Sequence, residues 1–163
     1  MISRPIDFDS GRGGDDNETP MECTLALLAD AANREEGGKL NVLGVFDVIH
    51  SDKFPYAMPQ FYVVVRLTAG PAEFGSKKAI ELVLLDPDGK VLGRIPGKAN
   101  VPTPDASGRA NMEVILRMVG VPFPKPGSYA IAVLVNGEQK HSIPIEVVQV
   151  KPSTGRRGRK SSG

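Results

Sequence analysis

Three side chains are of the types that most often act as nucleophile, base or metal ligand: Cys23, His50 and His141. A catalytic thiol needs a neighbouring base and a positive environment that stabilises the thiolate. Cys23 instead stands in the apolar run 22–29, where a cysteine usually serves as a small buried hydrophobe. We therefore expect no thiol catalysis. One cysteine and two scattered histidines also lack the paired spacing of a structural zinc site.

Carboxylate and carbonyl oxygens offer a second chemistry, because they are the ligands that calcium prefers. Asp30, Asn33 and Asp47 are expected at a loop end of the fold, where they would form a polar cluster able to hold a metal or serve a hydrolase-type site. Asp and Asn also favour turns without any ion, since their side chains bond the local backbone. No alternating-acid calcium loop occurs. We predict no metal or other cofactor, and no enzymatic role.

The third candidate is a run of cations near the carboxyl end: Arg156, Arg157, Arg159 and Lys160. Such a run attracts polyanions through charge alone. No aromatic side chains are interleaved for base stacking, and residues 21–150 are nearly neutral, with 13 Lys and Arg against 14 Asp and Glu. A nucleic-acid partner is therefore not expected. Polyanion binding through this tail is the alternative function.

Composition divides the chain of 163 residues into three parts. Residues 1–20 hold five acids and two arginines with little to bury, which predicts a disordered acidic arm. Residues 151–163 hold five cations among Ser, Gly and Pro, which predicts a disordered basic tail. Residues 21–150 suit one domain. A single cysteine favours a reducing compartment, taken as the cytoplasm, and the absence of 18 consecutive apolar residues predicts no membrane span.

Alternating apolar residues, the period of a half-buried strand, recur along the middle of the chain. Strands are predicted over residues 22–29, 40–49, 60–68, 77–85, 91–95, 111–119, 129–135 and 141–147. Turn signals separate them, with Asp86-Pro-Asp-Gly89 and Asn136-Gly137 the most specific. No amphipathic helix is evident. The pattern predicts an all-β fold: a single antiparallel β-sandwich of seven to eight strands, immunoglobulin-like with Greek-key connections.

Interruptions in this pattern carry further predictions. Gly44 shifts the alternation within 40–49, so a bulge is expected there, and residues 30–33 read as a polar corner. Residues 96–109 contain three prolines and two glycines and read as a long surface connection. Tyr129 follows a Pro-Gly-Ser approach that resembles a tyrosine corner, although it could equally be an ordinary core residue.

Proline also bears on the sheet edges, because a proline inside a strand belongs at an edge or a bulge. Pro144 therefore marks the strand near the carboxyl end as a guarded edge. The opposite edge of that sheet, or the strand 112–119, would then be free to pair with another chain. Ile115, Arg117 and Val119 point outward there and form the candidate partner surface, unless the second sheet or the long loop covers them. We expect a non-catalytic protein that acts through protein contacts, with an unknown partner or as a homo-oligomer.

Four motifs carry a resemblance to a known group of proteins. They are Leu27-Leu-Ala-Asp-Ala-Ala-Asn33, Gly38-Lys-Leu-Asn-Val-Leu-Gly-Val-Phe-Asp47, Phe123-Pro-Lys-Pro-Gly-Ser-Tyr129 and Val135-Asn-Gly-Glu138. With them the chain resembles a family of short uncharacterised bacterial proteins built on a domain of unknown function. The resemblance implies a small cytoplasmic β-sandwich. It supplies no activity, cofactor or catalytic residue.

Overall fold

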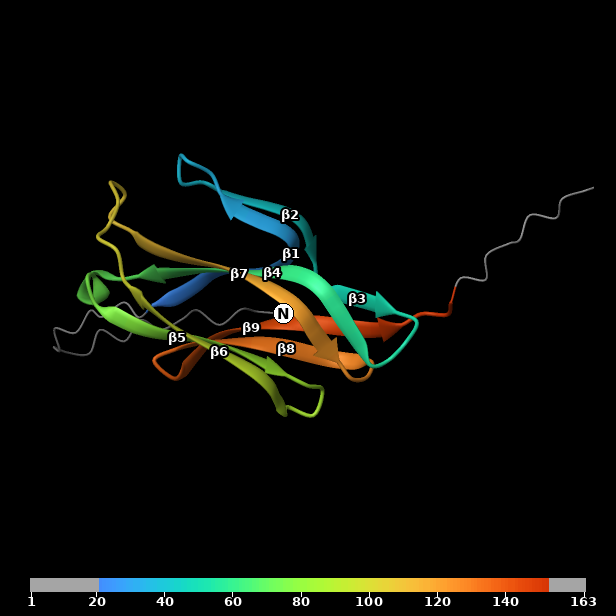
Figure 1. Ribbon diagram of the computed structural model, residues 1–163. Helices are drawn as coiled ribbons and strands as arrows, with labels where there is room; N and C mark the ends of the chain where they lie inside the picture. The colour runs from blue at the N-terminus through green and yellow to red at the C-terminus, as the bar shows by residue number, and fades with distance from the viewer. Residues whose placement is uncertain (1–20, 153–163) are drawn as a thin grey trace, which may run out of the picture.

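The computed structural model describes residues 21–152, which form two β-sheets packed face to face (Figure 1). The strands are β1 (Glu22–Arg34), β2 (Leu40–Phe46), β3 (Val48–Ser51), β4 (Tyr56–Ala69), β5 (Lys77–Leu85), β6 (Val91–Asn100), β7 (Ala110–Phe123), β8 (Gly127–Val135) and β9 (Glu138–Gln149). One sheet has the order β2-β1-β4-β7 and the other β3-β9-β8-β5-β6. The predicted immunoglobulin-like β-sandwich is confirmed.

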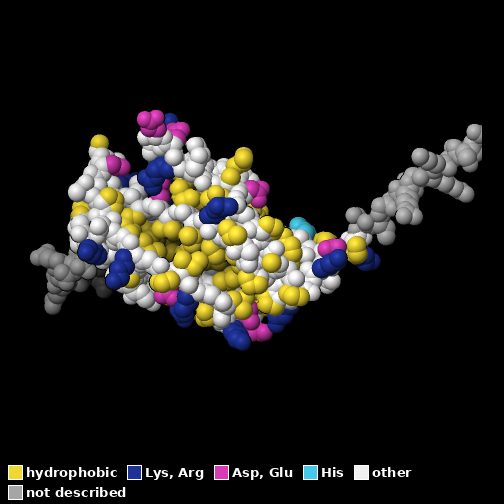
Figure 2. All heavy atoms as spheres, in the orientation of Figure 1, with side chains coloured by type: hydrophobic (Ala, Val, Ile, Leu, Met, Phe, Trp, Pro, Cys, Tyr) yellow, Lys and Arg dark blue, Asp and Glu magenta, His cyan; other side chains and the backbone are white. Residues whose placement is uncertain are grey.

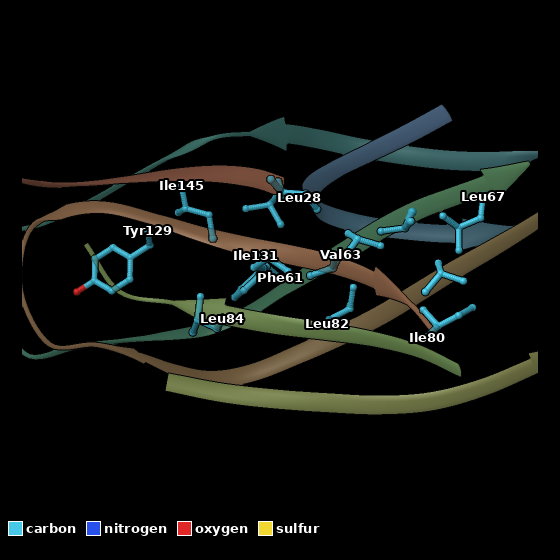
Figure 3. Close-up of a cluster of buried hydrophobic side chains, with 14 of the residues drawn as sticks. Leu28, Phe61, Val63, Leu67, Ile80, Leu82, Leu84, Tyr129, Ile131 and Ile145 are labelled. Atoms are coloured by element: carbon cyan, nitrogen blue, oxygen red, sulfur yellow. The ribbon is translucent and has the colours of Figure 1, made fainter. Parts of the chain in front are cut away.

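The core lies between the sheets and is built from the predicted alternation. Phe61, Val63, Val65 and Leu67 of β4 all point inward and are fully buried. Figure 3 shows side chains of β4 and β5, such as Val63 and Leu82, pointing into one shared interior. Burying a side chain of this size contributes about 1.5–3 kcal/mol. The alternation of apolar residues along each strand therefore gives each sheet one apolar face, and these two faces pack against each other.

The structure has nine strands in residues 21–152 because the run predicted as one strand over 40–49 is divided. β2 pairs with β1, whereas β3 pairs in parallel with β9 in the other sheet, so the chain changes layers at Asp47. The bulge predicted at Gly44 is absent. Ala29 pairs with Val45 and Ala31 with Leu43, so the register is continuous, and Gly44 absorbs the irregularity through a φ of +69°.

Two other predictions about connections are wrong. Residues 30–33, read as a corner, continue β1 to Arg34. The predicted loop 96–109 begins only after Asn100, because β6 runs on through Pro96 and Gly97. Proline is tolerated in β6 since this strand lies at the edge of its sheet and pairs with β5 alone. The amino-acid composition of this segment does not show that Pro96 and Gly97 lie in an edge strand.

The turn predictions hold. Asn136 (φ 50°) and Gly137 (φ 81°) both have left-handed backbone, as a type I′ hairpin requires, and they join β8 to β9. The backbone N–H of Gly89 donates to Asp86 O at 2.9 Å and closes the turn between β5 and β6. The Tyr129 hydroxyl donates to Lys125 O at 2.7 Å and accepts from Lys125 N at 3.2 Å. This arrangement is the predicted tyrosine corner, and it ties β8 to the loop that enters it.

The far half of the β1–β2 hairpin bends over the outer face of the four-stranded sheet. β1 pairs with β4 only as far as Ala29, after which it pairs with β2 alone. Arg34, at the end of β1, reaches Glu113 of β7, with Nη2 and Oε2 2.5 Å apart. Arg66 holds the other carboxylate oxygen at 2.7 Å. Glu113, whose side chain is 8% exposed, thus fastens the hairpin onto β7.

Among residues 21–152 no helix is long and apolar enough to cross a membrane. The single helical segment in this described part of the chain is a 3₁₀ turn at Pro71–Glu73. The predicted disordered arm and most of the basic tail, including Arg156, Arg157, Arg159 and Lys160, lie outside the described residues.

Candidate functional site

An apolar groove lies where the sandwich is open between two of its edge strands, β6 and β7. Two hollows of about 250 and 230 Å³ lie along it. They share Leu82 and Ile95, so they form one continuous feature, which we call the β6–β7 groove. Figure 2 shows hydrophobic side chains gathered in a band across the corresponding face. The lining residues are Val63, Ile80, Leu82, Leu84, Leu92–Ala99, Val114, Leu116, Met118–Pro122 and Ile131.

The groove is open because β6 has few side chains to place in it. Residues directly opposite in paired strands share a face, and β6 is paired with the inward residues of β5. Gly93 lies opposite Leu84, Ile95 opposite Leu82 and Gly97 opposite Ile80. Every second inward position is therefore a glycine. A Cβ added to Gly93 would meet nothing within 4 Å, which confirms that the space beside it is empty.

The inward side chains beside this gap stay partly exposed. Val114, Leu116 and Met118 of β7 pack against the core, yet they are only half-buried, in contrast to their fully buried neighbours on β4. Leu92 and Ile95 of β6 also pack against the core and are also only half-buried. Both edge strands thus leave apolar side chains exposed to water. This apolar surface lies between the two sheets, where it can receive another chain.

Few charged residues border the groove. Arg94 and Lys98 are the charged residues among those lining the two hollows, and both are exposed. Glu81 neutralises Arg94 in part, with Nη1 and Oε1 2.7 Å apart. Arg94 and Lys98 alternate with the inward positions Gly93, Ile95 and Gly97, so their side chains lie on the outer face of the five-stranded sheet.

The candidate partner surface on β7 borders this groove. β7 lies at the edge of its sheet as predicted, and Val119 is 65% exposed and lines the larger hollow. Arg117 is exposed and donates to Gln60 Oε1 at 2.6 and 2.9 Å. Ile115 is half-buried on the outer face, opposite Val64. Val119 therefore belongs to the groove, whereas Ile115 and Arg117 belong to the adjoining outer face.

The candidate loop-end cluster does not form as expected. Asp30 and Asn33 lie within β1, and three residues along a strand place them on opposite faces, about 10 Å apart. Asp47 lies beyond the end of β2, where the chain crosses to the other sheet. Residues 21–152 hold no group of three or more His, Cys, Asp or Glu side chains close enough to bind a metal ion. The polar residues were misplaced because the corner assumed at 30–33 is a strand.

Cys23 has the environment of a structural thiol. Its Sγ donates to Leu25 O at 3.5 Å, and burial raises the pKa of the thiol above its usual value. A raised pKa keeps the thiol protonated and unreactive near neutral pH. His50 on β3 and His141 on β9 are both exposed and belong to the other sheet. The structure does not bring the three side chains together as a catalytic set.

Sequence reasoning missed the features that make the groove. Gly93 was placed inside the predicted strand 91–95 and Gly97 was read as a loop residue, although glycines two strand periods apart were a signal of a thinned edge strand. It also missed the Arg34–Glu113–Arg66 cluster, since nothing in one sequence shows that the hairpin bends over β7.

Comparison with family models identifies one family. A family of unknown function (DUF6941) matches residues 24–148, as the resemblance to an uncharacterised family led us to expect. No curated protein matches the sequence.

Solved structures show similarity of fold alone. The chain aligns with the alkylpurine DNA glycosylase AlkC of Pseudomonas fluorescens at 13% identity and a TM-score of 0.50, covering 78% of this chain and 30% of that one. It aligns with a Listeria innocua beta-glucosidase at 10% identity and a TM-score of 0.46, covering 80% of this chain and 16% of that one. It aligns with an immunoglobulin-like protein of Pseudomonas aeruginosa at 11% identity and a TM-score of 0.41, covering 81% of this chain and 99% of that one. The chain therefore spans about a third of the glycosylase and about a sixth of the glucosidase.

Proposed function

The chain belongs to DUF6941, a family of unknown function, and we propose that it is a non-catalytic protein-binding β-sandwich that takes an extended polypeptide segment into the β6–β7 groove. The observation that carries the proposal is the row of inward-facing but half-exposed side chains on both edge strands, separated by empty space at Gly93. We further propose that it works in the cytoplasm, since its one cysteine leaves no internal disulfide to form.

An extended segment suits the groove better than a helix or a small ligand. β7 runs for 14 residues at the edge of its sheet, so no strand among residues 21–152 pairs with one side of its backbone. A free sheet edge binds a strand through main-chain hydrogen bonds, while pockets beside it select alternate side chains. The two hollows supply such pockets, and they are lined almost entirely by apolar residues.

The chemistry of the lining also specifies the occupant. Every second side chain of a strand added to β7 would enter the groove, and the others would lie on the outer face of the four-stranded sheet, the face of Arg117. The preferred segment thus alternates large apolar residues with polar ones. No acid or nucleophile lines the two hollows, which favours binding over catalysis at this site.

Filling the groove tests the proposal. We expect Gly93→Val to place two methyl groups in the empty space and to weaken binding of a labelled ten-residue peptide that alternates Ile or Phe with Asp. The expected loss is at least tenfold in Kd, equivalent to about 1.4 kcal/mol, measured by fluorescence anisotropy. Gly93 has no left-handed φ and no close neighbour, so the variant should fold.

The matched control is Ala79→Val, which adds the same branched side chain on the exposed outer face of β5. It should leave peptide affinity unchanged. Equal affinity for the alternating peptide and for one with its apolar residues clustered at one end would contradict the proposal, and so would unchanged binding by Gly93→Val.

A further inference from the structure

We propose that the extended segment received at the β6–β7 groove is β7 of a second copy of this chain, so that two copies pair edge to edge about a two-fold axis at Ile115. This inference rests on the proposed function, because it takes the edge of β7 and the groove beside it to be a site for an added strand. It names the partner that occupies this site when no other segment is bound.

β7 is the longest sheet edge among residues 21–152 and the least protected one. Edge strands are normally guarded by proline, by bulges or by short length. β6 contains Pro96, β3 has four residues, and β2 is interrupted by the left-handed Gly44. From Asn111 to Val119, β7 has no proline, and its register with β4 is continuous. It is therefore the edge best suited to pairing with another strand.

The sequence of β7 has the pattern that the groove selects. Its inward side chains are apolar, and those of Val114, Leu116 and Met118 are only half-buried. Its outward positions include Glu113 and Arg117. A second copy thus offers a strand in which large apolar residues alternate with largely polar ones.

The charges of β7 are complementary to themselves. Glu113 and Arg117 are the two charged residues between 111 and 119, and they lie two positions to either side of Ile115. A two-fold axis at Ile115 therefore places each Glu113 directly opposite Arg117 of the other copy. Facing opposite charges stabilise a strand pair, whereas facing like charges destabilise it. An axis at Leu116 would instead place Glu113 opposite Val119.

Glu113 can accept this additional arginine. Arg66 donates to its Oε1 at 2.7 and 2.9 Å. Arg34 Nη2 contacts Oε2 without the alignment of a hydrogen bond, so within residues 21–152 this oxygen accepts none. Because a carboxylate oxygen has two lone pairs, an acceptor site remains for Arg117 of the second copy.

Pairing in this register also closes the groove. A two-fold axis perpendicular to the sheet keeps both five-stranded sheets on the same side, so the two open sides face each other. The inward side chains then meet across the boundary, with Val114 opposite Leu116 of the other copy. On β6, the inward positions Gly93 and Gly97 leave room for these side chains. The half-exposed apolar rows of the two copies thus become one interior.

The contact is large enough for a specific dimer. Nine paired residues, 111–119, extend for about 30 Å. Two layers about 10 Å apart, with their side chains, give the open side a width of about 20 Å, so each copy buries about 600 Å². The total of about 1,200 Å² reaches the lower end of the range for specific interfaces. We therefore expect a reversible dimer with a Kd in the micromolar range.

Sedimentation equilibrium of the full chain tests the association. We expect a concentration-dependent shift from one chain mass to two. Arg117→Glu sets like charges opposite each other and should raise the Kd of the dimer at least tenfold. Lys53→Glu is the matched control, because it makes the same charge change in the exposed loop before β4 and should leave the Kd unchanged. A chain that stays monomeric up to millimolar concentration, or an unchanged Kd in Arg117→Glu, would overturn the inference.

Cross-linking tests which edge is paired. With the axis at residue 115, the thiols of two Ile115→Cys chains face each other, so a short bis-maleimide should join them in high yield. Leu43→Cys is the matched control, since it places a thiol at an exposed apolar position on β2, the other edge of the same sheet. Peptide mass spectrometry distinguishes these products from any that involve Cys23. Preferential coupling through residue 43 would assign the dimer to β2 and overturn the inference.

The alternating probe peptide separates this inference from the proposed function. If β7 of the second copy occupies the site, excess peptide should convert the dimer into monomers that each carry one peptide. A dimer that keeps its mass while it binds the peptide would overturn the inference and leave the proposed function intact. A dimer cross-linked at residue 115 that binds no peptide would support the inference and contradict the proposed function for segments other than β7 itself.

Discussion

At the scale of single residues, the most specific interaction in the fold is the pair of hydrogen bonds between the Tyr129 hydroxyl and the backbone of Lys125. The ring is buried and stands edge-on to Phe123, with ring centroids 5.1 Å apart. The hydroxyl therefore satisfies buried polar groups at the position where β7 turns into β8. It does so without a disulfide, which the single cysteine rules out.

Tyr129→Phe removes both hydrogen bonds while it keeps the ring. We expect the free energy of unfolding to fall by about 1–3 kcal/mol, since each intramolecular bond contributes about 0.5–1.5 kcal/mol. Urea denaturation followed by circular dichroism measures the change. Tyr62→Phe is the control, because within residues 21–152 the Tyr62 hydroxyl has no hydrogen bond; its unfolding free energy should change little.

Cys23 permits a prediction with no substitution at all. Burial raises the pKa of its thiol above the usual 9.0, so the reactive thiolate forms only at higher pH in the folded protein. The rate of alkylation by iodoacetamide should reach half its plateau near pH 9 for the urea-unfolded chain and at a higher pH for the folded protein. A folded-state rate that levels off below pH 8 would contradict this assignment.

Gly44 shows how a single backbone conformation replaces a predicted bulge. A Cβ at this position would lie 2.3 Å from Asp30 Oδ2, and the φ of +69° is itself unfavourable for other residues. We expect Gly44→Ala to lower the free energy of unfolding by about 1–3 kcal/mol. Combining it with Asp30→Ala should recover part of that loss, because the clash is relieved while the backbone strain remains.

At the scale of elements, strands were predictable wherever alternation buried one face. Residues 60–68 and 129–135 form such strands, and both fall within β4 and β8 of the structure. Edge elements were less predictable, because an edge strand tolerates the residues that otherwise mark loops. Pro96 and Gly97 in β6 are the example. The division of 40–49 between two sheets was also hidden, since both halves have the same local pattern.

The β1–β2 hairpin depends on Glu113, which contacts Arg34 and Arg66 from a largely buried position. Glu113→Gln should lower the free energy of unfolding by about 1.5–3 kcal/mol, the usual range for hydrogen bonds to a charged group. Hydrogen exchange should quicken first in β2. Glu81→Gln is the matched control: its pair with Arg94 is more exposed, so the loss should stay below about 1 kcal/mol. Equal losses in the two variants would contradict the role assigned to Glu113.

At the scale of the whole molecule, two sheets close along one side only. β1 and β9 approach each other at the closed side, and β6 and β7 stay apart at the open one. The sequence allowed the sandwich to be predicted, and it offered residues 112–119 as one of two alternatives for a free edge. That inference took Pro144 to mark an edge strand, whereas β9 lies between β3 and β8. The sequence did not allow the groove to be predicted, because a gap between two sheets depends on the distance between strands that are not neighbours in the chain.

The parallel pairing of β3 with β9 has a mechanical consequence. Val48–Ser51 hold residues 146–149 on one side, and β8 holds the same end of β9 on the other. Tension applied to the chain beyond Val150 would pull along β9, with the backbone hydrogen bonds of both neighbours lying across the direction of the force. These bonds share the load and must break together. The carboxyl end of the sandwich should therefore resist unfolding when the chain is pulled from that end.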